Sequence, residues 1–347
     1  MSIDVTRVET GRLGTAVRKA GDDSLPPLLL LHGNVSSSVF FEDLMRALAD
    51  LRSCIAPDFR GYGDSEVKPI DATRGVRDFS DDVRALVEAM RFEDPVDIVA
   101  WSAGGGVAMQ YAIDHPDSVR SLVLESAMSP YGFGGTRGTD GSPVWPDFAG
   151  SGGGTANPQF VERLAAADRS EDDPVTPRNV MNSFYFRPPF RVSSDDEERF
   201  VTAMLRMAIG DDVYPGDTRA SKNWPGVAPG TSGMNNAIAP KYLDLSGFAS
   251  IEPRPDVLWI RGADDQIVSD TSFFDFGYLG SLGAVPGWPG EDAYPPQPMV
   301  SQLRATLDEY RDGGGNYREV VYEDCGHSPH LECADRFVSD VRSFLEA

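Results

Sequence analysis

Residues 96–106 read VDIVAWSAGGG, a pattern that predicts a strand passing directly into a helix. The run Val96–Ala100 has the length and the β-branched content of a buried strand. A helical pattern follows over Ala103–His115 and ends where a proline prevents its continuation. Only Trp101 and Ser102 separate the two elements, so the chain must turn tightly at this point.

A serine on such a turn, here Ser102, holds its hydroxyl above the edge of the sheet. The turn accepts only small residues two positions before and after the serine, and Ala100 and Gly104 meet this requirement. Gly105 and Gly106 would let the helix pack closely against its neighbours. The pattern makes Ser102 a candidate nucleophile. The alternative is that Ser102 only caps the N-terminus of an ordinary helix.

Short apolar runs alternate with amphipathic stretches on both sides of this point, as is typical of a parallel sheet whose strands are joined by helices. Further strands are predicted at Leu28–Leu31, Ser53–Ala56, Ser121–Leu124, Val257–Arg261 and Arg318–Tyr322. Further helices are predicted at Val39–Leu51, Phe79–Arg91, Met299–Tyr310 and Ala334–Leu345. Two strands before Lys19 are expected to form an antiparallel edge around a turn at Gly11. The fold class is therefore α/β.

The composition changes in the middle of the chain, where residues 129–157 are rich in Gly, Pro and Trp and show no sustained periodicity. Helical patterns return at Asn157–Asp168, Pro177–Phe186 and Asp195–Ile209, before a second Gly- and Pro-rich stretch. We interpret Ser129–Ser250 as one inserted segment. It divides the chain into residues 1–128, 129–250 and 251–347. A long irregular loop over Ser269–Pro298 is expected to be functional or mobile.

Length and charge exclude several classes of protein. The 347 residues exceed one minimal domain, and an apolar fraction of 41% suffices for a sizeable core. The 31 basic and 54 acidic side chains give a net charge of −23. That charge repels phosphate backbones and anionic lipids, so nucleic acids and membranes are expected to be poor partners. Only four of the basic residues are lysines, as a salt-rich cytoplasm or a GC-rich genome would each produce.

The sequence also bears on the compartment. No apolar run approaches the ~18 residues needed to cross a bilayer, and Met1–Glu9 lacks a signal-peptide pattern. The three cysteines, Cys54, Cys325 and Cys333, are too few for a disulfide framework. We therefore expect a reduced, cytoplasmic protein.

A second motif, Leu30–Asn34, reads LLHGN at the end of an earlier predicted strand. Acyl transfer places negative charge on a carbonyl oxygen, and two backbone N–H groups must already point at that oxygen. Ala103, which follows the candidate nucleophile, would supply one of them. Asn34 is expected to supply the other. We interpret the His32 side chain as shaping the loop.

A serine hydroxyl also needs a histidine base, and the base needs a carboxylate to orient it. The chain has only four histidines. His115 ends a predicted helix and His32 belongs to the Leu30–Asn34 loop, which leaves His327 and His330. Gly326 favours an exposed turn around His327, which is therefore the expected base.

These motifs and their order resemble the α/β-hydrolase superfamily, in which the nucleophile, the acid and the base follow one another along the chain. The stretch Asp58–Ser65, DFRGYGDS, also matches a loop of that superfamily. The resemblance implies that Ser102, Asp265 and His327 form the catalytic set, with Asp265 preferred to Asp264. It also implies a mostly parallel eight-stranded sheet with helices on both faces and an inserted, mainly helical cap.

The motifs depart from several subfamilies. Haloalkane dehalogenases and epoxide hydrolases have an aspartate nucleophile, whereas this chain has Ser102 beside a dehalogenase-like loop, His32 to Asn34. The His-Gly-Gly-Pro-Gly loop of proline iminopeptidases is absent. Glu125, directly after the predicted strand Ser121–Leu124, is an alternative acid because some members place it there.

A rival hypothesis is metal binding, since Cys325, His327, His330 and Cys333 offer four zinc-type ligands. They lie too close together for the usual two ligand pairs, and zinc would occupy the expected base. Another rival is a hydrolase-fold receptor without activity, although no member of the expected catalytic set is missing.

The sequence therefore predicts a serine hydrolase that cleaves an ester or lactone of a small-to-medium apolar acid, with no metal and no organic cofactor. Hydrolysis of an amide or of a carbon–carbon bond beside a ketone remains an alternative. So does transfer of the acyl group to an alcohol or peroxide. The expected partner is a small-molecule substrate.

Overall fold

One large sheet organises the chain in the computed structural model, which describes residues 2–92 and 94–347. Its eight strands run in the order β1-β2-β4-β3-β5-β6-β13-β14. They are β1 (Asp4–Glu9), β2 (Gly14–Ala20), β3 (Pro27–Leu31), β4 (Ser53–Pro57), β5 (Val96–Trp101), β6 (Val119–Glu125), β13 (Asp256–Gly262) and β14 (Tyr317–Tyr322). β2 pairs antiparallel with both β1 and β4, and the strands from β3 onward are parallel to one another. The predicted mostly parallel sheet is confirmed.

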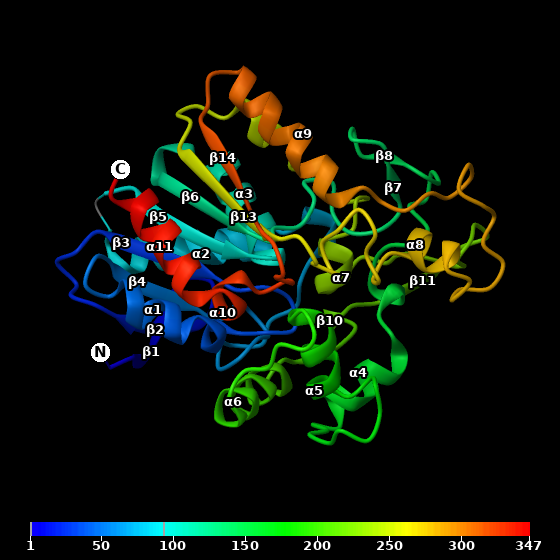
Figure 1. Cartoon of the computed structure of the whole chain (residues 1–347), viewed down its shortest axis with the longest axis horizontal. Coiled ribbons are helices and arrows are strands. Elements are labelled where there is room, and N and C mark those ends of the chain that lie inside the picture. Colours follow the sequence, from blue (N-terminus) through cyan, green and yellow to red (C-terminus); the bar gives the residue numbers. More distant parts are fainter. Residues whose placement is uncertain (1, 93) are drawn as a thin grey trace.

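Helices cover the sheet, as Figure 1 shows. The helices that flank the sheet are α1 (Glu42–Leu48), α2 (Arg77–Met90), α3 (Ala103–Asp114), α9 (Met299–Asp312) and α11 (Ala334–Leu345). α1 packs against α11, and α2 packs against α3. The central strands of the sheet are not accessible to solvent: every residue of β3, β4 and β5 is buried. Continuous apolar strands of this kind are what a parallel sheet covered on both faces requires.

The segment between β6 and β13 contributes no strand to the large sheet. Its helices are α4 (Pro158–Ala165), α5 (Pro177–Val180), a π-helical turn over Met181–Tyr185, α6 (Ser194–Leu205) and α7 (Met234–Ala237). Figure 1 shows α4, α5 and α6 grouped below the sheet. Helices contribute more residues to this segment than strands do, but most of its residues lie in turns and irregular loops, so the structure does not show the mainly helical segment that was expected. The limits 129–250 stay a prediction.

Three small sheets were not predicted within this segment. They pair β7 (Thr136–Arg137) with β8 (Ser142–Pro143), β9 (Ile209–Gly210) with β10 (Tyr214–Pro215), and β11 (Thr218–Ala220) with β12 (Val227–Pro229). Strands of two or three residues are too short to show an alternating apolar pattern, so no sequence pattern marks them.

Short helices complete the fold. The predicted irregular loop Ser269–Pro298 contains α8 (Phe276–Ser281), and α10 (Pro329–Glu332) precedes α11. Single 3₁₀ turns lie at Ser38–Phe41, Ala72–Arg74, Pro116–Ser118, Gly153–Thr155 and Ser246–Ser250. No helix in residues 2–92 and 94–347 is both long enough and apolar enough to cross a membrane.

Candidate active site

Ser102 occupies a strained turn at the carboxyl end of β5. Its backbone angles are φ 57° and ψ −122°, and its side chain makes no capping hydrogen bond to α3. The alternative role as an ordinary N-cap is therefore not what the structure shows. Strained non-glycine backbone of this kind is concentrated at functional sites, because the surrounding structure must hold it in place.

The small residues after Ser102 are required by close packing. A Cβ atom on Gly104 would lie 2.3 Å from the carbonyl oxygen of Leu31. A Cβ atom on Gly105 would lie 2.5 Å from the Cβ of Ala127. The glycines thus allow α3 to start directly against the ends of β3 and β6, which fixes the position of Ser102.

The loop that follows β3 lies directly beside Ser102. A Cβ atom on Gly33 would lie 2.9 Å from the Ser102 Cβ and 3.4 Å from its Oγ. The Asn34 side chain is held on both sides: its Oδ1 accepts a hydrogen bond of 2.6 Å from the Tyr62 hydroxyl, and its Nδ2 donates to Asn235 over 3.1 Å. The structure therefore brings Asn34 and Ala103 to the same end of the sheet as Ser102.

His327 and Asp265 form a buried pair. Asp265 Oδ2 lies 2.8 Å from His327 Nδ1, and both side chains are 3% exposed. The other oxygen, Asp265 Oδ1, accepts hydrogen bonds from the backbone N–H groups of Ile267 and Val268 over 2.8 and 3.0 Å. One carboxylate thus holds its own loop and orients the imidazole, which leaves His327 Nε2 as the nitrogen available for proton transfer.

Trp101 connects this pair to the serine. Its indole Nε1 donates a 2.8 Å hydrogen bond to the carbonyl oxygen of His327, and the two rings lie 5.5 Å apart. Because Trp101 directly precedes Ser102, the serine and the histidine lie at one edge of the sheet. That edge is where the carboxyl ends of β5, β13 and β14 meet, as ligand sites in parallel sheets usually do.

The loops after β13 and β14 approach each other at a glycine. A Cβ atom on Gly262 would lie 2.1 Å from the carbonyl oxygen of Gly326 and 2.2 Å from that of Cys325. Any side chain at this position would separate the two loops. Gly262 is therefore needed for the contact between Asp265 and His327, a role that its place in the motif alone did not reveal.

A second histidine–carboxylate pair lies close to the first, and the histidines of both pairs lie beside the Trp101 ring. His330 Nδ1 is 2.7 Å from Glu125 Oε1, and both side chains are fully buried. Glu125 also accepts a hydrogen bond from the His330 backbone N–H over 2.8 Å. The alternative acid thus pairs with His330 and not with His327.

Glu332 is a carboxylate that sequence reasoning did not single out. It accepts hydrogen bonds from the backbone N–H groups of Gly326 and Ser328, the two residues that flank His327, over 3.0 and 3.2 Å. Burial raises the pKa of Glu332, while these backbone donors oppose the shift. No sequence motif marks this residue, because its role depends on how α10 folds back over the histidine loop.

His32 has a structural environment. Its Nε2 accepts a 3.0 Å hydrogen bond from the Phe59 backbone N–H, and its Nδ1 lies 2.8 Å from the Gly33 carbonyl oxygen. Burial lowers the pKa of His32 to about 4, partly offset by the negative charge of Asp58. The neutral ring joins the Leu30–Asn34 loop to the Asp58–Ser65 loop, in agreement with a loop-shaping role.

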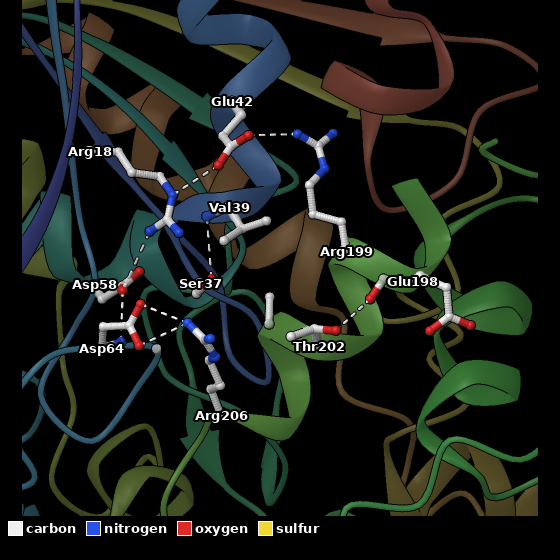
Figure 2. A pocket seen from close by; sticks show the side chains of 12 residues that line it. Arg18, Ser37, Val39, Glu42, Asp58, Asp64, Glu198, Arg199, Thr202 and Arg206 are labelled. Carbon is white, nitrogen blue, oxygen red and sulfur yellow. Dashed lines mark hydrogen bonds and ion pairs between the residues drawn. The ribbon is translucent and has the colours of Figure 1, made fainter. Parts of the chain in front are cut away.

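A charged cavity of about 320 Å³ lies where α6 meets the core. Figure 2 shows Arg199 of α6 reaching Glu42 of α1, a distance of 2.7 Å, and Arg206 reaching Asp64 over 2.8 Å. Its lining does not include Ser102. Because each of these arginines faces a carboxylate, we interpret the cavity as part of the contact between α6 and the core and not as the reaction site. Among the residues described, no group of three or more His, Cys, Asp or Glu side chains is arranged to hold a metal ion.

Known proteins resemble this chain at several levels. A sequence model described as the alpha/beta hydrolase fold matches residues 26–180. The 2-hydroxymuconate semialdehyde hydrolase of Pseudomonas sp. strain CF600 is 37% identical over 325 residues, which cover 92% of this chain and 86% of that protein.

Other matches are shorter or more distant. The pimeloyl-[acyl-carrier protein] methyl ester esterase of Neisseria meningitidis strain H44/76 is 35% identical over 113 residues, which span 32% of this chain and 40% of that enzyme. The match to a cis-3-alkyl-4-alkyloxetan-2-one decarboxylase of Shewanella oneidensis spans 36% of that protein. The esterase RhEst1 from Rhodococcus sp. ECU1013 shares the fold, with a TM-score of 0.60, 20% identity, and coverage of 100% of this chain and 99% of that one.

Proposed function

The chain belongs to the α/β-hydrolase fold family, and from this premise we propose that it is a serine hydrolase acting through an acyl-enzyme on Ser102. The observation that carries the proposal is the buried contact of 2.8 Å between Asp265 and His327, at the end of the sheet where Ser102 occupies a strained turn. A hydroxyl, an imidazole and a carboxylate in this relation are the minimum that nucleophilic acyl transfer needs.

The proposed reaction begins when Ser102 Oγ attacks the carbonyl carbon of the substrate and His327 Nε2 takes the hydroxyl proton. Asp265 holds the His327 tautomer and stabilises the imidazolium that forms. The backbone N–H groups of Asn34 and Ala103 donate hydrogen bonds to the oxyanion. His327 then gives its proton to the leaving group. Water attacks the acyl-enzyme with His327 again as the base, which releases the acid and restores Ser102.

We propose a carboxylic ester or lactone of a small-to-medium apolar acid as the substrate. Support comes from the buried aromatic rings around the base: Trp101 lies 5.5 Å from the His327 ring and Tyr185 lies 6.3 Å from it. Aromatic side chains close to the reacting groups favour an apolar acyl group. The sequence relatives named as esterases act on esters, which agrees with this choice.

Cleavage of a carbon–carbon bond is the second candidate reaction. It is favoured by the relative that matches over 92% of this chain, a 2-hydroxymuconate semialdehyde hydrolase, because the compound in its name contains no ester bond. Hydrolysis beside a ketone would use the same serine, histidine and oxyanion donors.

We also propose that residues 129–250 form a cap and that residues 1–128 and 251–347 form the catalytic core. Support comes from the strands of the large sheet, which come only from residues 4–125 and 256–322. A cap over the carboxyl ends of the strands would determine which small-molecule substrate reaches Ser102.

The proposal is tested by labelling the protein with an alkyl fluorophosphonate and by turnover of p-nitrophenyl esters of increasing chain length. We expect Ser102→Ala to lose labelling and nearly all turnover while its melting temperature stays close to that of the wild type. Ser126→Ala is the matched control, because Ser126 is buried nearby and its hydroxyl has no hydrogen-bond partner. If Ser102→Ala were labelled as strongly as the wild type, the assignment of Ser102 as the nucleophile would be wrong.

Further arms separate the alternatives. A wild-type protein that takes up no probe would favour the receptor hypothesis. Product analysis with and without an alcohol acceptor distinguishes hydrolysis from acyl transfer. Turnover of 2-hydroxymuconate semialdehyde, the compound in that relative's name, but of none of the esters, would favour carbon–carbon bond cleavage.

A further inference from the structure

Three consecutive residues between β6 and β13, Tyr185–Arg187, contact the three loops that carry Asn34, Asp265 and His327. We propose that this positioning segment (Tyr185–Arg187) holds the oxyanion loop and the histidine loop in their reactive arrangement, so that the cap contributes to the chemical step as well as to substrate binding. The inference rests on the proposed serine-hydrolase function and adds positioning residues to it.

The first contact is with the oxyanion loop. The Tyr185 hydroxyl lies 2.9 Å from the Val35 carbonyl oxygen and 3.3 Å from that of Asn34, so its single proton is donated to this pair of backbone groups. Tyr185 is almost completely buried, and burial raises the pKa of its phenol well above the usual value. The hydroxyl therefore remains protonated and can act as a donor at any pH at which the protein works.

The backbone conformation at this contact must be stabilised by groups outside the loop. Val35 has a φ of 48°, a left-handed conformation that a β-branched residue rarely adopts. Such a conformation persists only when its surroundings impose it. The Tyr185 hydroxyl, which comes from the end of the π-helical turn Met181–Tyr185, is one of the groups that impose it on the peptide beside Asn34.

The second contact is with the histidine loop. The backbone N–H of Arg187 donates a 2.7 Å hydrogen bond to Glu332, the same carboxylate that accepts from the N–H of Gly326 and of Ser328. Gly326 lies directly against the segment, since a Cβ atom there would lie 2.7 Å from the Arg187 nitrogen. Glu332 therefore links the positioning segment to both neighbours of His327.

The third contact crosses to the loop that carries Asp265. The Arg187 side chain pairs with Asp264 over 2.5 Å and with Asp324 over 3.0 Å. One guanidinium thus bridges the loop of the proposed acid and the loop of the proposed base. Arg187 and Asp264 are partly exposed and Asp324 is largely exposed, so each ion pair contributes little stability by itself, and their main effect is on the relative position of the two loops.

The decisive experiment compares Tyr185→Phe with Tyr242→Phe. Both variants delete one hydroxyl that belongs to the proposed cap and donates to a backbone carbonyl. The Tyr185 hydroxyl donates to Val35 and Asn34 of the proposed core, whereas the Tyr242 hydroxyl donates to Gly230 within the cap. We expect Tyr185→Phe to lower kcat about 10- to 100-fold with KM nearly unchanged, because a displaced oxyanion loop weakens transition-state binding. The rate of fluorophosphonate labelling should fall in parallel. Tyr242→Phe should leave both quantities as in the wild type.

Two further variants test the histidine loop. Arg187→Gln removes the bridge between Asp264 and Asp324 but keeps the backbone N–H, and Glu332→Gln weakens the carboxylate that accepts from Arg187, Gly326 and Ser328. Both should slow labelling without a matching rise in KM. They also keep the inference testable if Tyr185→Phe fails to fold.

The outcomes separate this inference from the function on which it rests. If the wild-type protein were not labelled, the proposed serine-hydrolase function itself would be contradicted. Normal labelling of the wild type, together with unchanged labelling rates and kcat in Tyr185→Phe, Arg187→Gln and Glu332→Gln, would overturn the positioning role alone. A change in KM only would assign the segment to substrate binding and would equally overturn it.

Discussion

Asp265 and Glu125 each contact the ring of a histidine, and of these two carboxylates only Asp265 contacts the proposed base. Asp265 contacts His327, whereas Glu125 contacts His330 behind Trp101. A carboxylate that fixes the tautomer of a catalytic histidine has a large effect on turnover, because its loss leaves the wrong nitrogen protonated. The two carboxylates should therefore respond very differently to substitution by the corresponding amide.

We expect Asp265→Asn to lower kcat by roughly 10⁴ with the fold preserved. Glu125→Gln is the control, because a glutamine oxygen can still accept the hydrogen bond from the His330 backbone N–H. Steady-state kinetics on a p-nitrophenyl ester measures both. A small loss for Asp265→Asn together with a large loss for Glu125→Gln would transfer the role of the acid to Glu125.

The buried His32 makes stability depend on pH. Since its pKa in the folded protein is about 4 and its usual value is about 6.5, the unfolded chain takes up a proton between these values that the folded chain does not. The contribution of His32 is therefore present above pH 6.5 and is lost as the pH falls toward 4. Between pH 7 and pH 4.5 the free energy of unfolding should fall by about 2 kcal/mol on this account.

Denaturant titrations at pH 7 and pH 4.5 measure this effect as the difference between wild type and His32→Gln. The comparison is needed because Asp275, whose pKa burial raises to about 6, acts in the opposite direction over the same range. We expect the variant to lose less stability on acidification than the wild type. Equal losses in the two proteins would contradict the low pKa of His32.

The positions of individual residues could be predicted where their chemistry was tied to a short motif, whereas the catalytic roles assigned to them stay predictions. Ser102, Asp265 and His327 each follow a predicted strand, and the structure places all of them at the carboxyl ends of strands of one sheet. Tyr185 and Glu332 could not be found in the same way. Their importance comes from contacts across 150 and 6 positions of the chain, which local patterns do not encode.

Among the elements, buried parallel strands were the most predictable. Continuous apolar runs such as Val96–Ala100 mark them, because both faces of the sheet are covered. The helical pattern over Pro177–Phe186 is less faithful, since the structure divides it into α5 and a π-helical turn that ends at Tyr185. That widening of the helix depends on contacts made by the turn and leaves no periodicity in the sequence.

Helix α3 should tolerate no added side-chain volume where it meets β6. We expect Gly105→Ala to lower the free energy of unfolding by about 1–3 kcal/mol, because its Cβ would meet Ala127. Gly247→Ala is the control, since a Cβ atom at that position meets no atom within 4 Å. Denaturant titration of both variants tests the packing, and equal stabilities for the two would contradict it.

The whole molecule carries a net charge of −23, which destabilises the compact state through self-repulsion. At about 1 M salt the Debye length is only about 3 Å, so this repulsion is screened. We therefore expect the melting temperature to rise between dilute and molar KCl. A parallel series in sucrose separates screening from the exclusion of solute from the surface. A melting temperature that stays flat or falls in KCl would argue against adaptation to a salt-rich cytoplasm.

At the scale of the whole molecule, the sequence predicted the order of the core but not how the inserted residues sit on it. The contact between α6 and α1 through Arg199 and Glu42 joins residues 157 positions apart, and both belong to charged stretches without a distinctive pattern. The packing of the inserted segment on the core depends on the shapes of the two surfaces, and these shapes form only when the chain has folded.

The inserted residues leave the sheet from β6 and return to it at β13, and these two strands pair side by side. Exchange of the intervening stretch between homologues therefore keeps the core register intact, so chimaeras should express and fold readily. A chimaera whose inserted segment lacks counterparts of Tyr185 and Arg187 should nevertheless fold well but have a low kcat. Recombination libraries built on this protein should accordingly keep Tyr185 and Arg187 in every segment that is exchanged to change substrate specificity.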